Sequence, residues 1–71
     1  MENQGNEYDK YEGKNVIFTL WDNLKQYVKI KKNDKEKKWL EVIDVTNKND
    51  IHYLKYYLIG VAVVKIEFDK N

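Results

Sequence analysis

A run of lysines followed by a tryptophan carries the side chains of this sequence that are best suited to ligand chemistry. Residues 35–38 read Lys-Glu-Lys-Lys, with an aspartate before them and an indole after them. A nucleic-acid base can stack on an indole ring while nearby ammonium groups neutralise phosphate. The candidate nucleic-acid site therefore comprises Asp34, Lys35, Lys37, Lys38 and Trp39. The simpler alternative is a solvated loop between strands, with the tryptophan in the core.

Residues that carry enzymatic chemistry are scarce. The chain has no cysteine, no serine and a single histidine, His52, so the usual Cys/His zinc shells and the common nucleophiles are missing. Thr19 and Thr46 have no spacing that implies a partner base, and neither a phosphate loop nor a dinucleotide-binding glycine pattern occurs. We therefore predict a protein that is not an enzyme and that uses no metal and no cofactor.

Length and charge limit the class of protein. Seventy-one residues allow one small hydrophobic core, and a chain of this size without disulfides or metals usually needs a partner subunit. We therefore predict a homo-oligomer. Thirteen lysines, with no arginine, against 12 acidic residues give a net charge of +1, which excludes a general nucleic-acid compactor and an acidic nucleic-acid mimic. The absence of a signal segment or a long apolar run predicts a soluble, cytoplasmic protein without a membrane partner.

The first nine residues differ in character from the rest of the chain. They are polar and lack periodicity, which predicts a flexible N-terminal lead-in over residues 1–9 and a single small β-barrel domain over residues 10–71. Residues 8–11 could form one helical turn, which Gly13 would end.

From Asn15 onward, β-branched and aromatic residues alternate with polar ones in short runs, which is typical of strands. Val16, Phe18 and Leu20 share one face of a first strand, and a tight turn at Asp22-Asn23 follows. The remaining expected elements are a strand from about Leu24 to Lys32 with Val28 and Ile30 inward, a strand over Trp39–Thr46, a turn at Asn47–Asp50, a strand over Ile51–Ile59, a break at Gly60 and a strand over Val61–Phe68.

A helix over residues 50–58 is the main alternative, because no breaker interrupts that stretch and Leu54 and Leu58 lie four apart. Its β-branched and aromatic residues favour a strand. Five short antiparallel strands in about 55 residues fit a small closed barrel of the Sm, SH3-like or OB type, or a curled open sheet. Closure removes the sheet edges, so we predict an all-β fold in which a strongly bent five-stranded antiparallel sheet closes into a small Sm-like or SH3-like barrel.

Two segments resemble the Sm-like (LSm/Hfq-type) family of small β-barrels. The first motif of that family is similar to the stretch that contains Gly13, Lys14, Val16, Phe18, Leu20, Asn23, Val28, Ile30 and Asp34. The second motif is similar to YYLIGVAVVKI, residues 56–66, where Gly60 fills the glycine position. The resemblance covers most of the chain, although both motifs are degenerate.

The resemblance implies a ring that contacts single-stranded RNA near Asp34 and Gly60. It also implies that the fourth strand of one subunit pairs with the fifth strand of the next, with Tyr53, Tyr57, Val61 and Val63 as candidate subunit-interface residues. Barrel packing with solvated hydroxyls is the alternative for the tyrosines. The sequence departs from the family where RNA binds: Lys38 or Trp39 stands at the asparagine position and Ile59 at the arginine position.

The leading hypothesis from the sequence is therefore an Sm-like RNA-binding protein that forms a homo-oligomeric ring. The alternative is a non-enzymatic protein-interaction module, an SH3-like or degenerate Sm barrel that acts as a scaffold or as a viral or plasmid-encoded inhibitor of another protein. The missing asparagine and arginine favour this alternative.

Overall fold

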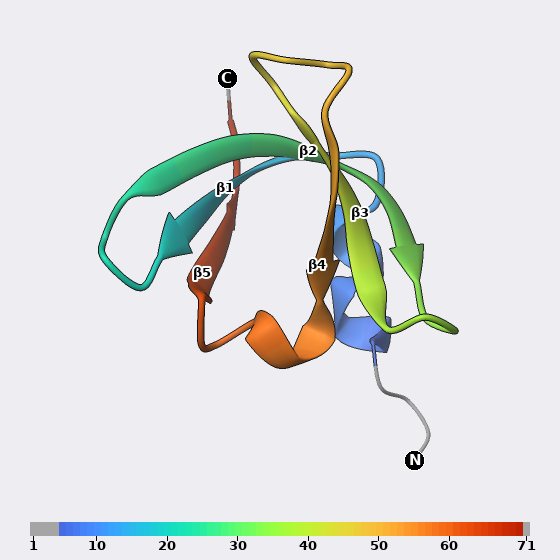
Figure 1. Ribbon diagram of the computed structural model, residues 1–71. Coiled ribbons are helices and arrows are strands. Elements are labelled where there is room, and N and C mark those ends of the chain that lie inside the picture. The colour runs from blue at the N-terminus through green and yellow to red at the C-terminus, as the bar shows by residue number, and fades with distance from the viewer. Residues whose placement is uncertain (1–4, 71) are drawn as a thin grey trace.

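The computed structural model describes residues 5–70 and shows an antiparallel sheet with two short 3-10 helices (Figure 1). The elements in chain order are η1 (Asn6–Tyr11), β1 (Asn15–Leu20), β2 (Lys25–Asp34), β3 (Trp39–Asp44), β4 (Ile51–Lys55), η2 (Tyr56–Leu58) and β5 (Val63–Phe68). Neither helix within residues 5–70 is long and apolar enough to cross a membrane.

The five strands form one sheet in the order β4-β3-β2-β1-β5, and all neighbours are antiparallel. This confirms the prediction of an all-β fold with a five-stranded antiparallel sheet. Register shifts at Thr19/Leu20 and at Ile30/Lys32 interrupt the ladders, and such irregularities bend a sheet. Figure 1 shows β2 curving over the top of the sheet, while η2 links β4 to β5 below. Among residues 5–70, β4 and β5 do not pair with each other, so the sheet is open rather than closed into a barrel.

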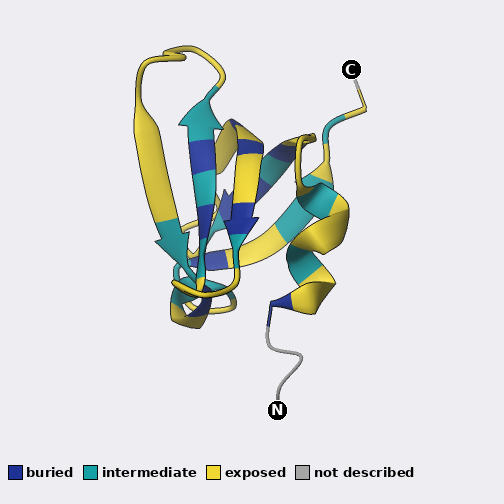
Figure 2. Ribbon diagram, turned by 90° about the vertical axis from the view of Figure 1, so that its right-hand side faces the viewer, coloured by how far each residue is buried: buried dark blue, intermediate teal, exposed yellow. Residues whose placement is uncertain are grey.

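The core lies on the concave face of this sheet, because alternate side chains of each strand point to that face. Val28 and Ile30 are buried, as predicted. Figure 2 shows the buried positions as bands along the strands between exposed ones. The full set of buried apolar residues is Val16, Phe18, Val28, Ile30, Leu40, Val42, Tyr56 and Val63.

Two of the turns follow directly from the local sequence. Asn23 has a φ of 72°, in the left-handed region that asparagine tolerates well, and the Asp22 side chain accepts a hydrogen bond from the Leu24 amide. The Asn47–Asp50 segment turns the chain between β3 and β4, where the Asp50 amide donates to the Asn47 carbonyl at 3.0 Å. Both predicted turns are confirmed.

The predicted fourth strand is wrong in its second half. β4 ends at Lys55, and the next three residues form η2, with Tyr56 buried in the core and its amide donating to the Lys38 carbonyl. Burial of this ring therefore turns the chain out of the sheet. Because Gly60 lies in the following turn at a φ of 94°, β5 begins at Val63 rather than at Val61.

The N-terminal segment agrees with the prediction only in part: residues 8–11 are helical, as expected for one turn that ends before Gly13, but the helix begins earlier, within the predicted lead-in. Asn6–Tyr11 forms η1 instead of continuing an irregular lead-in to Asp9, and the Tyr8 ring packs against the Tyr56 ring with centroids 5.0 Å apart. The part of the predicted lead-in at residues 1–4 lies outside the described residues. Contacts with residues far along the chain, which a local pattern does not reveal, stabilise this helix.

Candidate functional site

The turn between β2 and β3 holds the predicted lysines in a defined conformation. The Asp34 carboxylate accepts a hydrogen bond from the Lys37 amide at 3.1 Å, and the Asp34 carbonyl accepts one from the Lys38 amide at 2.8 Å. Lys38 has a φ of 63°, which completes the tight turn. Aspartate favours such turns because its side chain can bond the backbone further along. Asp34 therefore shapes the turn, and Trp39 starts β3 opposite it in the ladder.

Two lysines from different elements gather over the Trp39 ring. The Lys55 Nζ lies 4.6 Å from the ring centroid, and the Lys37 Nζ lies 5.6 Å from it. Both distances are within the range of cation–π attraction. The Tyr53 ring packs against the same indole, with centroids 4.8 Å apart. Trp39 Nε1 is buried and has no hydrogen-bond partner among residues 5–70. The indole ring is therefore partly buried, and it attracts the ammonium groups of Lys37 and Lys55 through cation–π contacts.

A groove of about 260 Å³ opens beside this cluster. The residues that line it come from the β2–β3 turn, the end of β4 and the start of η2: Lys37, Lys38, Lys55, Tyr56 and Tyr57. The hydrogen bond from the Tyr56 amide to the Lys38 carbonyl, at 2.9 Å, joins the turn to η2 and fixes the two walls relative to each other. The Tyr57 side chain is 74% exposed, whereas Tyr56 is buried.

The charge in this groove is not neutralised within the described part of the chain. Neither Lys37, Lys38 nor Lys55 forms an ion pair there, in contrast to Lys35, whose Nζ lies 2.6 Å from an Asp9 carboxylate oxygen. The three groove lysines are therefore available to an anionic ligand.

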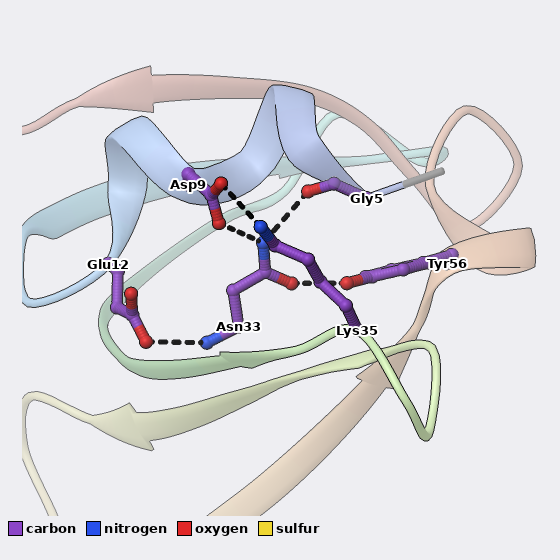
Figure 3. A network of polar contacts seen from close by, with 6 residues as sticks. All are labelled: Gly5, Asp9, Glu12, Asn33, Lys35 and Tyr56. Carbon is purple, nitrogen blue, oxygen red and sulfur yellow. Dashed lines mark hydrogen bonds and ion pairs between the residues drawn. The ribbon is translucent and has the colours of Figure 1, made fainter. Parts of the chain in front are cut away.

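A buried polar network behind the groove attaches η1 to β2 and η2 (Figure 3). The Asn33 side-chain amide donates to the Gly5 carbonyl at 2.8 Å and to the Asp9 carboxylate at 2.9 Å. The Tyr56 hydroxyl donates to Asn33 Oδ1, and the Glu12 carboxylate accepts a hydrogen bond from the Asn33 backbone amide. Asn33 thus connects three segments that are far apart in the sequence.

Electrostatics support this network. The hydrogen bond from the Lys35 ammonium holds the pKa of the Asp9 carboxyl below its ordinary value, which favours the charged acceptor. Burial raises the pKa of the Tyr56 phenol, so its hydroxyl remains protonated and donates to Asn33. Gly5, at a φ of 93°, lies so close to the Tyr56 ring that an added Cβ would be 2.5 Å from the phenolic oxygen.

The predicted site residues divide into three groups. The structure brings Lys37, Lys38 and Trp39 together, with Asp34 holding the turn. It places Lys35 in the ion pair with Asp9 rather than in the groove. Gly60 lines a different depression, beside Tyr8 and Tyr11 of η1.

Lys55 and Tyr57 were not among the predicted nucleic-acid-binding residues, although Tyr57 was a candidate interface residue. For Lys55 the predicted turn was misleading, because a hairpin counted outward from residues 47–50 places Leu58 opposite Trp39. The structure pairs Trp39 with Lys55 instead, because β3 ends at Asp44 and the connection to β4 is longer than predicted. No local signal existed for Tyr57, since its position depends on the unexpected helix η2.

The candidate subunit-interface residues include both exposed and buried side chains. Tyr53, Tyr57 and Val61 are exposed, but Val63 is 4% exposed and belongs to the core. The choice of Val63 as a surface contact was therefore wrong, because its side chain points inward and packs with the other buried apolar residues. On β5 the exposed large apolar side chains are Val64 and Phe68.

Both edges of the open sheet carry exposed apolar side chains. Ile51 and Tyr53 lie on β4, and Val64 and Phe68 lie on β5. A hollow of about 220 Å³ lies next to these edges, lined partly by the core residues Phe18, Val42 and Val63, by the partly buried Leu54 and by His52. Within residues 5–70 no group of three or more acidic, histidine or cysteine side chains could hold a metal ion.

The chain matches no protein-family model, no curated protein and no solved structure.

Proposed function

We propose that the protein is an Sm-like RNA-binding protein whose copies join edge to edge into a ring and contact single-stranded RNA through the groove lysines. The observation that carries this proposal is the open five-stranded sheet, which leaves two different strands of one chain, β4 and β5, as free edges with exposed apolar side chains.

Free edges favour assembly. An edge strand presents unpaired N–H and C=O groups, and natural proteins usually cover such edges. When β4 of one copy pairs with β5 of the next, each copy still has one free edge, so pairing continues until the assembly closes into a ring. The pairing would also bury Tyr53 of one copy and Val64 of the other. A small chain without disulfides gains the additional core that it needs in this way.

The groove supplies the RNA contact. Single strands bind where positive charge follows the backbone and where aromatic rings accept the bases. Lys37, Lys38 and Lys55 supply the charge, and the net charge of only +1 means that binding depends on this local concentration. The positions at which the Sm-like family carries asparagine and arginine are not filled by those residues here, so we expect weak sequence preference.

Sedimentation equilibrium tests the assembly. We expect a mass several times the 8.6 kDa of one chain at micromolar concentration. Val64→Lys, on the exposed side of β5, should lower this mass, whereas Val45→Lys, at an exposed valine outside both edges, should leave it unchanged. A mass near 8.6 kDa for the unchanged protein would contradict edge pairing.

A titration with poly-uridine at several salt concentrations tests the RNA contact. Binding through lysine must weaken as salt rises, because each neutralised phosphate releases a counterion. A protein that assembles but does not bind poly-uridine at low salt would instead favour the protein-interaction module, since exposed apolar residues such as Val61 would then be the main functional surface.

A further inference from the structure

Trp39 is poorly placed to stack on a base, although it is the aromatic residue nearest to the lysine turn. Lys55 and Lys37 already lie over its ring, and the Tyr53 ring packs against it. A base could stack there only after these side chains had moved and their cation–π contacts had been lost. The indole is better suited to hold the two ammonium groups in position.

Tyr57 has the opposite surroundings. Its side chain is 74% exposed and forms one wall of the groove, and no ring contact or hydrogen bond of its side chain occurs within residues 5–70. Its neighbour Tyr56 cannot replace it, because that hydroxyl bonds Asn33 and that ring packs on Tyr8. Tyr57 is therefore the free aromatic face closest to the unpaired lysines.

The size of the groove indicates what it can hold. Pockets that enclose free small molecules usually measure about 300–1,000 Å³. At about 260 Å³ with an open side, this groove is better suited to one unit of a longer strand than to an enclosed ligand. Three lysines on its other walls can neutralise the phosphates on either side of that unit.

We infer that this groove binds one nucleotide of a single strand, with its base on Tyr57 and the adjacent phosphates on Lys37, Lys38 and Lys55. This inference rests on the proposed RNA-binding function and names the residues that carry it. Trp39 then acts as a positioning residue, because it holds Lys37 and Lys55 beside the groove without touching the base.

The test compares variants of the full chain in oligouridine titrations across a range of salt concentrations. Tyr57→Ala should raise the Kd by about 5- to 150-fold, the range measured for loss of one stacked base, and should leave the salt slope unchanged. Tyr57→Phe should keep the affinity, because the ring remains. Tyr27→Ala, at an exposed tyrosine on β2 outside the groove, is the matched control and should change nothing.

Replacement of the lysines should instead change the salt dependence of binding. Replacing Lys37, Lys38 and Lys55 with alanine should reduce the slope of log affinity against log salt by about 2, because each phosphate contact on a single strand contributes about 0.7. Polyglutamate should bind far more weakly than oligouridine, since it offers charge without a base. Equal binding of the two polymers would assign the groove to acidic proteins and would overturn the inference.

Fluorescence gives an independent readout. Trp21→Phe leaves Trp39 as the single tryptophan of the chain. A base stacked directly on Trp39 would quench its emission strongly, and that result would overturn the assignment to Tyr57. We expect only slight quenching at saturating oligouridine.

The outcomes separate the two proposals. If the unchanged protein does not bind oligouridine, the proposed function fails and this inference fails with it. If the protein binds but Tyr57→Ala binds equally well, only this inference fails. A Tyr57→Ala variant that loses its oligomeric mass would place Tyr57 in the subunit interface and would also overturn the inference.

Discussion

Replacement of Asn33 by alanine should strongly destabilise the protein, because this one side chain holds η1, β2 and η2 together. Asn33 is 7% exposed, and its side chain takes part in three hydrogen bonds, to the Gly5 carbonyl, the Asp9 carboxylate and the Tyr56 hydroxyl. Alanine removes all three and leaves a buried carbonyl and a buried hydroxyl without these partners.

The size of the effect follows from these contacts. A hydrogen bond contributes a net 0.5–1.5 kcal/mol, so loss of three lowers the free energy of unfolding by about 2–4 kcal/mol. At about 0.05–0.15 kcal/mol per residue, a chain of this length has a total stability of roughly 4–10 kcal/mol. A small domain loses about 4–8 °C of Tm per kcal/mol, so Tm should fall by roughly 10–30 °C.

Thermal unfolding followed by circular dichroism measures this change, with urea denaturation as a second method. Asn49→Ala, in the exposed β3–β4 turn, is the matched control and should change stability by less than about 0.5 kcal/mol. A double-mutant cycle with Tyr56→Phe should give a coupling energy of about 0.5–3 kcal/mol. A Tm within about 3 °C of the parent, or additive effects in the cycle, would refute the role of Asn33 as the central link.

Further predictions concern β5, the turn before it and the Asp9 ion pair. Val63→Lys should cost about 3–5 kcal/mol in urea denaturation, because it places an unpaired charge in the core, whereas Val45→Lys, at an exposed valine outside both edges, should barely change the free energy of unfolding. Gly60→Val should cost about 1–3 kcal/mol through its positive φ, and Gly60→Asn should cost less; equal losses would show that backbone strain is not the cause. Because Lys35 lowers the pKa of Asp9 in the folded state, the stability from this pair is present above the ordinary carboxyl value of 3.8 and is lost as pH falls through the lower folded value. Asp9→Asn should therefore show a smaller loss of urea midpoint between pH 6 and pH 3 than the parent, and an identical loss in both proteins would contradict the assignment.

Local patterns in the sequence were sufficient for most of the sheet. The alternation of apolar and polar residues predicted β1 and the inward face of β2, because side chains of a strand alternate regardless of what lies beyond it. The turn at Asn23 was also predictable, since a short polar side chain and tolerance of positive φ are properties of the residue itself. These features depend on neighbours within a few residues.

Local sequence was less sufficient for predicting the candidate groove than for predicting the sheet. Lys37, Lys38 and Trp39 adjoin in the sequence and were found together. Lys55 depends on a strand register that differs from the one implied by the predicted turn at residues 47–50. The position of the Tyr57 side chain could not be predicted, because β4 was expected to include Tyr57. In a strand, the alternation of side chains would have decided which face of the sheet the Tyr57 side chain pointed to. Its exposure beside the lysines follows from η2, which forms where the Tyr56 ring enters the core.

Tertiary contacts alone determined the features on which the proposed function depends. η1 forms in a polar segment because Asn33 and Tyr56, more than 20 residues away, supply its partners. The open edges at β4 and β5 follow from strand order and curvature, which no single strand encodes. Sequence alone determined most of the segments that extend and the two turns before β2 and β4, because those preferences are local. Where β4 ends, which edges remain free and which aromatic ring faces the lysines depend on packing between distant residues, so only the tertiary structure determined them.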